Sequence, residues 1–147
     1  MNCFIQLRRG ELYDAIARIA AHTADNLPIS EAGDPMQHLE ITDLAHPTID
    51  NFINQAIDLI SSAVSDRLTS VNNTTDSIAF TFALPPSFKI VLLDNLRLNL
   101  FDIVTNYAAS SWLKLANEQL GATYEQKAAG LLQQLIISIF SHHRLKR

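Results

Sequence analysis

The chain has 147 residues, of which 48% are hydrophobic and 18% charged, and its formal net charge is −4. This length suits one domain, and the apolar fraction is high enough for a buried core. With 4 glycines and 5 prolines the chain is not collagen-like or low-complexity, and the single cysteine, Cys3, excludes an internal disulfide or a multi-cysteine zinc site. The acidic balance gives no reason to expect nucleic acid as a specific partner.

No targeting or membrane segment is expected. The apolar runs are too short for a membrane-spanning helix, and the positive charges near the start follow a brief apolar stretch, the reverse of the order in a signal peptide. We therefore expect synthesis in the cytoplasm and no membrane partner. No internal repeat divides the chain, so residues 1–147 are expected to form one helical domain.

The first part of the chain indicates an arm followed by a helix. Residues 1–10 are expected to form an N-terminal arm, in which the apolar residues of 3–7 favour a strand or an extended segment. Apolar residues at helical spacing then predict a first helix over residues 11–25. Pro28 must end this helix, because proline lacks the backbone donor and restricts the residue before it.

Two further segments are marked by proline. Residues 28–46 predict a long acidic loop, and loops of this length in compact domains are often functional. Pro47 suits the first position of a helix, and the apolar stripe after it predicts a second helix over residues 47–68. Residues 69–86 predict a loop with one short strand, residues 78–84, where large apolar residues alternate with small ones.

The last third of the chain predicts two helices. Residues 87–117 contain no glycine and no internal proline and predict an unusually long third helix, which Gly121 closes. Thr123 and Gln126 have the spacing of a capping box, so a final helix is expected over residues 124–144. The predicted fold class is therefore mainly α: a four-helix single domain with one long central helix and a small β element. The two candidate strands can pair within or between chains.

The polar residues of the third helix fall on one stripe. Their spacing of four, three and four places Asn95, Asn99, Asp102 and Asn106 on one face. This polar stripe is either the exposed edge of a buried helix or a subunit contact whose side chains pair across the interface. Nearly every other residue is apolar, so the helix is either the centre of the core or covered by another subunit. The side chains expected in the core are Leu92, Leu96, Phe101 and Val104.

Charge is unevenly distributed along the chain. Residues 19–66 hold eight acidic residues and no lysine or arginine. Such a separation suits self-association in which the basic end of one subunit meets the acidic loop of another, whereas an ordinary solvated face with a basic tail is the commoner reason for it. The basic residues at the two ends of the chain are Arg8, Arg9, Arg144, Lys146 and Arg147.

No pattern in the sequence favours catalysis. The serine pairs at 61–62 and 110–111 lack the glycines of a nucleophile elbow, and the histidines at 142–143 have no evident carboxylate partner. One segment is crowded with possible metal ligands, but without the spacing of a known metal motif, so a solvated acidic loop is expected there. We expect no enzyme activity, no cofactor and no metal. The possible ligands are Asp34, His38, Glu40, Asp43, His46 and Asp50.

The order of several segments points to one family. The segment His38-Leu39-Glu40-Ile41 precedes the acidic Asp43 and the amphipathic helix over residues 47–68. Leu84-Pro85-Pro86, the apolar stretch 90–115 and the final helix 124–144 follow in turn. In this order the chain resembles tailed-bacteriophage head–tail connector proteins over residues 38–147. The first helix and the length of the third depart from that family, which leaves a tail-completion or other neck protein open.

This resemblance implies a non-enzymatic adaptor in the neck of a virion. Such a protein forms a ring, commonly of twelve copies, between the portal protein and the tail, and DNA passes through its channel without specific binding. The interface residues then expected are the polar stripe and the basic tail, Arg144, Lys146 and Arg147. Two other functions stay open: a cytosolic helical regulator or partner-binding module whose third helix receives a peptide or protein, and an enzyme with a metal in the acidic loop.

Overall fold

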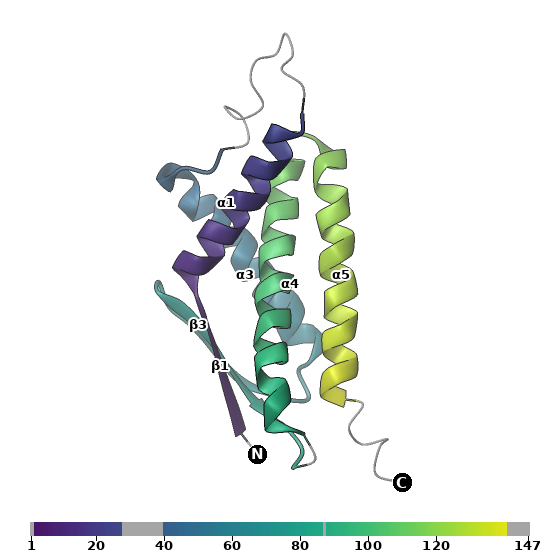
Figure 1. Cartoon of the computed structure of the whole chain (residues 1–147). Helices are drawn as coiled ribbons and strands as arrows, with labels where there is room; N and C mark the ends of the chain where they lie inside the picture. The colour runs from purple at the N-terminus through teal and green to yellow at the C-terminus, as the bar shows by residue number, and fades with distance from the viewer. Residues whose placement is uncertain (1, 28–39, 87, 141–147) are drawn as a thin grey trace.

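The structure is a computed structural model that describes residues 2–27, 40–86 and 88–140 (Figure 1). These residues form four α-helices and one three-stranded antiparallel sheet, which confirms the mainly α fold. The helices are α1 (Arg9–Asp25), α3 (His46–Ala63), α4 (Leu93–Lys114) and α5 (Glu118–Phe140). The strands are β1 (Asn2–Arg8), β2 (Leu68–Asn73) and β3 (Ser77–Ala83), and two 3-10 turns, η1 (Asp43–Ala45) and η2 (Ile90–Leu92), precede α3 and α4.

The arm and the predicted strand pair within the chain. The strand order is β1-β3-β2, and β1 runs antiparallel to β3 with Ile5 opposite Phe80. Every second residue of β1 is buried, so Cys3, Ile5 and Leu7 face the helices. This alternation is the pattern of a sheet with one face on the core. The arm is therefore a strand, and Cys3 is an apolar side chain of its inner face.

The prediction of a loop over residues 69–76 is wrong, because β2 occupies most of it. Its sequence, Leu-Thr-Ser-Val-Asn-Asn, is mostly polar, and only Leu68 and Val71 are partly buried. A shift of register between Leu68 and Ser70 also interrupts the regular alternation of side chains. β2 is an edge strand with most side chains in water, so the period-two apolar signal that marks β3 is missing.

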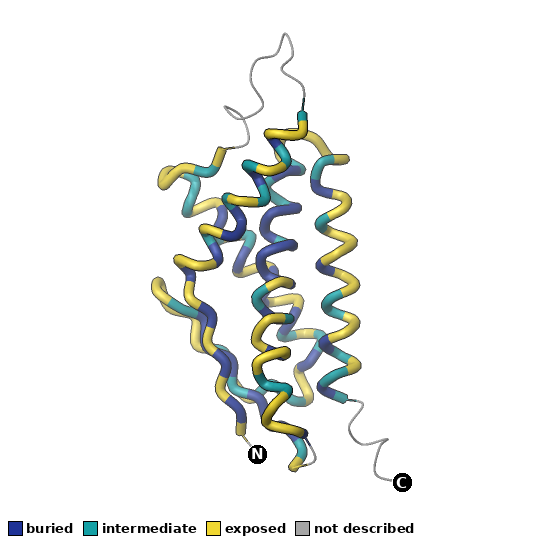
Figure 2. Tube along the Cα trace, in the orientation of Figure 1, coloured by how far each residue is buried: buried dark blue, intermediate teal, exposed yellow. Residues whose placement is uncertain are grey.

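Helix α4 is the centre of the helical layer. It contacts α1, α3, α5 and β1, and its buried residues are concentrated in its second half, whereas its beginning is largely exposed (Figure 2). Of the four side chains predicted in the core, Leu96 and Val104 are buried, and Leu92 and Phe101 are partly buried against the core. The part of the structure described here contains no helix that is both long and apolar enough to cross a membrane.

The predicted boundary between the last two helices is wrong. The third helix begins only at Leu93, after η2, and ends at Lys114. Helix α5 begins at Glu118, where the Asn117 side-chain oxygen accepts a hydrogen bond from the Gln119 backbone at 2.9 Å. This bond is of the type that caps a helix start.

Gly121 lies inside α5 instead of ending α4. A methyl group at this position would clash with the backbone carbonyl of Ser110 on α4. The glycine is therefore required by the close approach of two antiparallel helices. The capping box expected at Thr123 and Gln126 does not exist, because both residues lie within the continuous helix.

Candidate functional site

The polar stripe runs along the side of α4 that turns toward α5. Asn106 lies one turn before Ser110, the residue that meets Gly121 of α5. Asn106 is buried and its side-chain nitrogen donates to the Asp102 backbone oxygen at 2.7 Å, whereas Asp102 itself is exposed. Within the described residues the side-chain oxygen of Asn106 has no hydrogen-bond partner. Asn106, at this end of the stripe, therefore lies in the core of its own chain.

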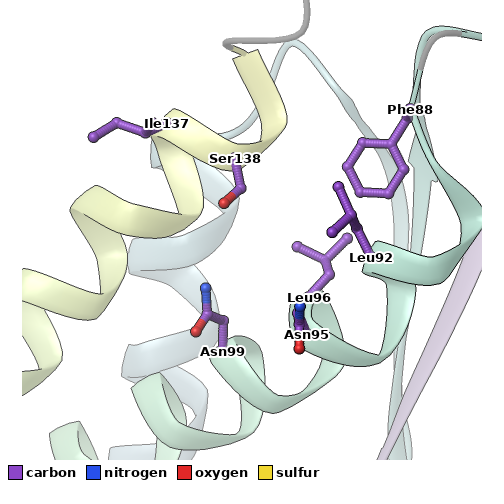
Figure 3. Close-up of a pocket in the computed structure, with 7 residues that line it drawn as sticks. All are labelled: Phe88, Leu92, Asn95, Leu96, Asn99, Ile137 and Ser138. Atoms are coloured by element: carbon purple, nitrogen blue, oxygen red, sulfur yellow. The ribbon is translucent and has the colours of Figure 1, made fainter.

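The other end of the stripe opens into a groove. Asn95 and Asn99 of α4 and Ser138 of α5 line a cavity of about 220 Å³ between the start of α4 and the end of α5 (Figure 3). In Figure 3 the side chains of Asn99 and Ser138 point into the gap between the two helices. The remaining lining residues are Phe88, Leu92, Leu96 and Ile137. We refer to these seven residues as the α4–α5 groove.

Several exposed apolar side chains belong to the α4–α5 groove or lie close to its residues in the sequence. Ile90 and Val91 of η2 and Ile137 of α5 are each more than half exposed, and Leu98 of α4 is half exposed. Single exposed apolar residues are ordinary on protein surfaces, but several at one end of a helix pair are typical of a contact site. The groove thus combines an apolar wall, an apolar rim and three polar side chains.

Two exposed cations lie next to the groove in sequence. Lys89 follows Phe88, and Arg97 follows Leu96; Asp94 is the one acidic residue between them. The basic tail predicted as an interface, Arg144, Lys146 and Arg147, lies outside the described residues. Asp102 of the polar stripe is exposed as well, and Arg97 lies on the side of α4 away from Asn95 and Asn99, so these residues give the groove no excess of positive charge.

A second polar site, centred on Arg9, was not predicted from the sequence. The Arg9 side chain is only 6% exposed, and its guanidinium donates to Asp50 Oδ1 at 2.7 Å and to the Thr74 backbone oxygen at 2.7 Å. It also donates to the side-chain oxygens of Asn54, at 3.2 Å, and of Asn73. These bonds join the start of α1 to α3 and to the turn after β2. We refer to this arrangement as the Arg9 clamp.

Tyr13 extends the Arg9 clamp along α1. Its hydroxyl donates to Asp50, and its ring stacks on His46 with the ring centroids 4.1 Å apart. Burial, followed by the hydrogen bond to Asp50, raises the pKa of the Tyr13 hydroxyl above its ordinary value. Because Arg9 and Tyr13 of α1 both donate to Asp50 Oδ1 of α3, the clamp is a structural link between α1 and α3.

The acidic segment considered for a metal is only partly described. Asp34 and His38 lie outside the described residues. His46 Nε2 is 3.9 Å from Asp43 Oδ1, and Asp50 belongs to the Arg9 clamp. Across residues 2–27, 40–86 and 88–140 no three side chains of the metal-binding types gather at one point.

Comparison with known proteins adds no relative. No protein family, curated protein or solved structure matches this chain. The resemblance to head–tail connector proteins therefore stays a prediction from the sequence.

Proposed function

We propose that this chain is a non-enzymatic structural subunit that assembles with copies of itself, as a ring-forming head–tail connector between the portal and the tail of a virion. The observation that supports the proposal is the apolar rim around the α4–α5 groove. Ile90 and Val91, which directly precede the groove residue Leu92, and Ile137, which lines the groove, are each more than half exposed. Burying one such side chain completely is worth about 1.5–3 kcal/mol, so covering all three favours association.

The uneven burial of α4 along its length fits this proposal. Its second half is the centre of the core, while its first half carries the groove and the half-exposed Leu98. A helix that is apolar on most sides is covered either by its own chain or by another subunit. In α4 the second half is covered by its own chain, and we propose that another subunit covers the first half. A ring of about twelve subunits, as the resemblance implies, needs two different contact patches on each subunit. The net charge of −4 is suited to a channel that repels DNA phosphates.

Light scattering on the purified chain tests the proposal. We expect an oligomer of defined mass, visible as a ring by electron microscopy, alone or after addition of the portal protein. Leu98→Asp is expected to weaken the oligomer while the helix content stays unchanged, because Leu98 is already 50% exposed. A chain that stays monomeric at high concentration, with and without portal protein, would contradict the proposal.

The basic tail gives a second test of the same proposal. Reversing Arg144, Lys146 and Arg147 to glutamate should slow joining and leave the subunit folded, because exposed charge pairs mainly steer association. Each such pair contributes less than about 1 kcal/mol and is screened over about 8 Å at physiological ionic strength, so rising salt should weaken joining of the unmodified chain. Unchanged, salt-sensitive joining after deletion of residues 144–147 would show that the tail is dispensable.

A partner-binding module is the second candidate, because the α4–α5 groove has the mixed lining of a peptide site. Its apolar wall would hold an anchoring side chain, and Asn95, Asn99 and Ser138 would bind peptide groups. The two candidates differ in solution. A partner-binding module stays monomeric both alone and with portal protein, whereas a connector subunit associates with copies of itself in at least one of these conditions.

A further inference from the structure

The turn that joins α4 to α5 is short and consists of residues that suit a helix. Leu115, Ala116 and Asn117 form it, with no glycine or proline among them. Leu115 keeps helical backbone angles, with φ −63° and ψ −31°, and the Asn117 backbone still donates to the Leu113 oxygen at 3.1 Å, as in an α-helix. The chain therefore follows the helical path almost to the end of the turn.

One side chain supports the reversal of direction at this turn. Asn117 Oδ1 accepts a hydrogen bond from the Gln119 backbone at 2.9 Å and so caps the start of α5. Leucine and alanine, the other two residues of the turn, are among the best helix formers. If the turn became helical, the first backbone donors of α5 would bond to the last backbone carbonyls of α4, groups that separate helices leave without an intrahelical partner.

The faces of α4 and α5 that meet would stay in line if the helix ran straight through the turn. Ser110 of α4 lies against Gly121 of α5. At 3.6 residues per turn, the four buried residues of α5 would all fall within about 20° of Ser110 around the axis of a continuous helix. A straight helix would therefore carry both contact faces on one side. The four buried residues are Gly121, Ala128, Leu135 and Ile139.

Helix α5 depends on α4 for most of its packing. Figure 1 shows the two helices side by side, and α5 makes only a small contact with α3. An ion pair between Lys114 and Glu125 also joins α4 to α5. A straight helix would carry α5 away from its own α4 and expose the buried faces of both, which is unfavourable in water. Another α5 would cover the α4 face with the same contacts, and a second copy of this chain supplies one.

We propose that two copies of this chain exchange α5: the turn at residues 115–117 becomes helical, and α5 of each copy packs antiparallel on α4 of the other. The contacts between α4 and α5 are re-formed, so the monomer and this exchanged dimer differ mainly at the turn and in the cost of association. The exchange is reciprocal and two-fold symmetric, and it therefore stops at two copies. It uses contacts that the chain makes with itself, so it does not depend on the proposed ring, whose subunits associate head to tail.

Changing Asn117 tests the role of the turn. Asn117→Ala removes the cap and leaves three helix formers in a row, so we expect more dimer after refolding at high concentration. Loss of one cap shifts an equilibrium about fivefold, and a dimer straightens two turns, so its association constant should rise about 25-fold. Asn51→Ala is the matched control, because Asn51 is exposed within α3 and lies outside the turn. It should associate as the unmodified chain does.

Lengthening the turn should have the opposite effect. An insertion of glycine and serine residues between Ala116 and Asn117 eases the reversal of direction, so this chain should stay monomeric. Size-exclusion chromatography with light scattering measures the dimer fraction of each chain, and circular dichroism shows whether it is folded. Equal dimer fractions in the Asn117→Ala, Asn51→Ala and lengthened chains would overturn the inference.

The Lys114–Glu125 ion pair shows whether a dimer is exchanged. Lys114→Glu places two carboxylates across the contact of α4 with α5, and Glu125→Lys places two cations there, so each variant repels its own α5. In an exchanged dimer with one copy of each variant, both contacts pair opposite charges again. Refolding the two variants together should raise the ratio of mixed to uniform dimers at least about threefold above the statistical ratio, as measured by ion-exchange chromatography. Lys89→Glu in place of Lys114→Glu is the control and should give the statistical ratio, because Lys89 is exposed and precedes α4.

The outcomes separate this inference from the proposed function. If neither the unmodified chain nor the Asn117→Ala chain forms dimers on refolding, the exchange is wrong, and the proposed ring is unaffected. If dimers form but the charge variants mix in statistical proportions, the dimers use another surface and the exchange is again wrong. Enrichment of the mixed dimer supports the exchange whether or not the unmodified chain also assembles into rings.

Discussion

Replacing Arg9 by methionine tests the contribution of the Arg9 clamp to stability. The substitution keeps an apolar stem and removes the guanidinium, so Asp50 loses its cation and the Thr74 carbonyl loses its donor. Removing one partner of a buried ion pair costs about 3–5 kcal/mol. The Asp50 side chain is 36% exposed, and water replaces part of the lost interaction. We therefore expect a loss near the lower end, about 3 kcal/mol.

Urea and thermal unfolding followed by circular dichroism measure this effect. For a chain of this size each kcal/mol corresponds to about 2–4 °C, so a loss of about 3 kcal/mol lowers the melting temperature by about 6–12 °C. Arg8→Met is the matched control, because Arg8 precedes Arg9 directly and is exposed. Its effect should stay within about 0.5 kcal/mol. Arg9→Lys should lie between the two, since lysine keeps the charge but lacks the planar fork.

Similar stabilities of the Arg9→Met and Arg8→Met chains would contradict this prediction. Such a result would mean that the loss of the clamp's hydrogen bonds is balanced by relief of the cost of burying the guanidinium. In that case the connection between α1 and α3 would depend on apolar packing, and the clamp would contribute little to the free energy of unfolding.

Three further predictions concern single side chains. The pKa of Tyr13 is raised above its ordinary value of 10.0, so the folded chain holds this proton more tightly than the unfolded chain. The free energy of unfolding should therefore fall as the pH rises above 10.0. Urea unfolding at each pH measures this fall, which should be less steep in Tyr13→Phe. Gly121→Ala should cost about 1–3 kcal/mol because its methyl group meets the Ser110 carbonyl. Gly130→Ala is the control in the same helix; it has open space around it and should stabilise the chain by about 0.5–1 kcal/mol. Equal melting temperatures of the two variants would contradict this prediction. Thr105→Val removes a buried hydroxyl that lacks a partner among the described residues, and should raise stability by about 1 kcal/mol in the same assay; a clear loss would show that the hydroxyl is bonded.

Elements that bury one face of a regular structure were predictable. Helix α3 buries Ile49, Ile53 and Ile60 at helical spacing, and Pro47 lies in its first turn, where the missing donor costs nothing. Strand β3 buries Ile78, Phe80 and Phe82, and its alternation is visible in the sequence. In both elements the periodicity is a local property of the chain, so it could be read without knowledge of any partner.

Features that depend on a distant partner were decided only by the tertiary structure. Arg9 is buried because Asp50, 41 positions away, and the turn after β2 come to it, while the sequence shows only two adjacent arginines. β2 is a strand because β3 supplies its hydrogen bonds, although its own residues are polar. Residue 121 must be a glycine because α4 approaches α5 closely there, and at the other end of the same helix pair Asn99 and Ser138 line a shared groove. Apolar periodicity is encoded residue by residue, whereas burial of a charge, pairing of an edge strand and the distance between two helices exist only after the chain has folded.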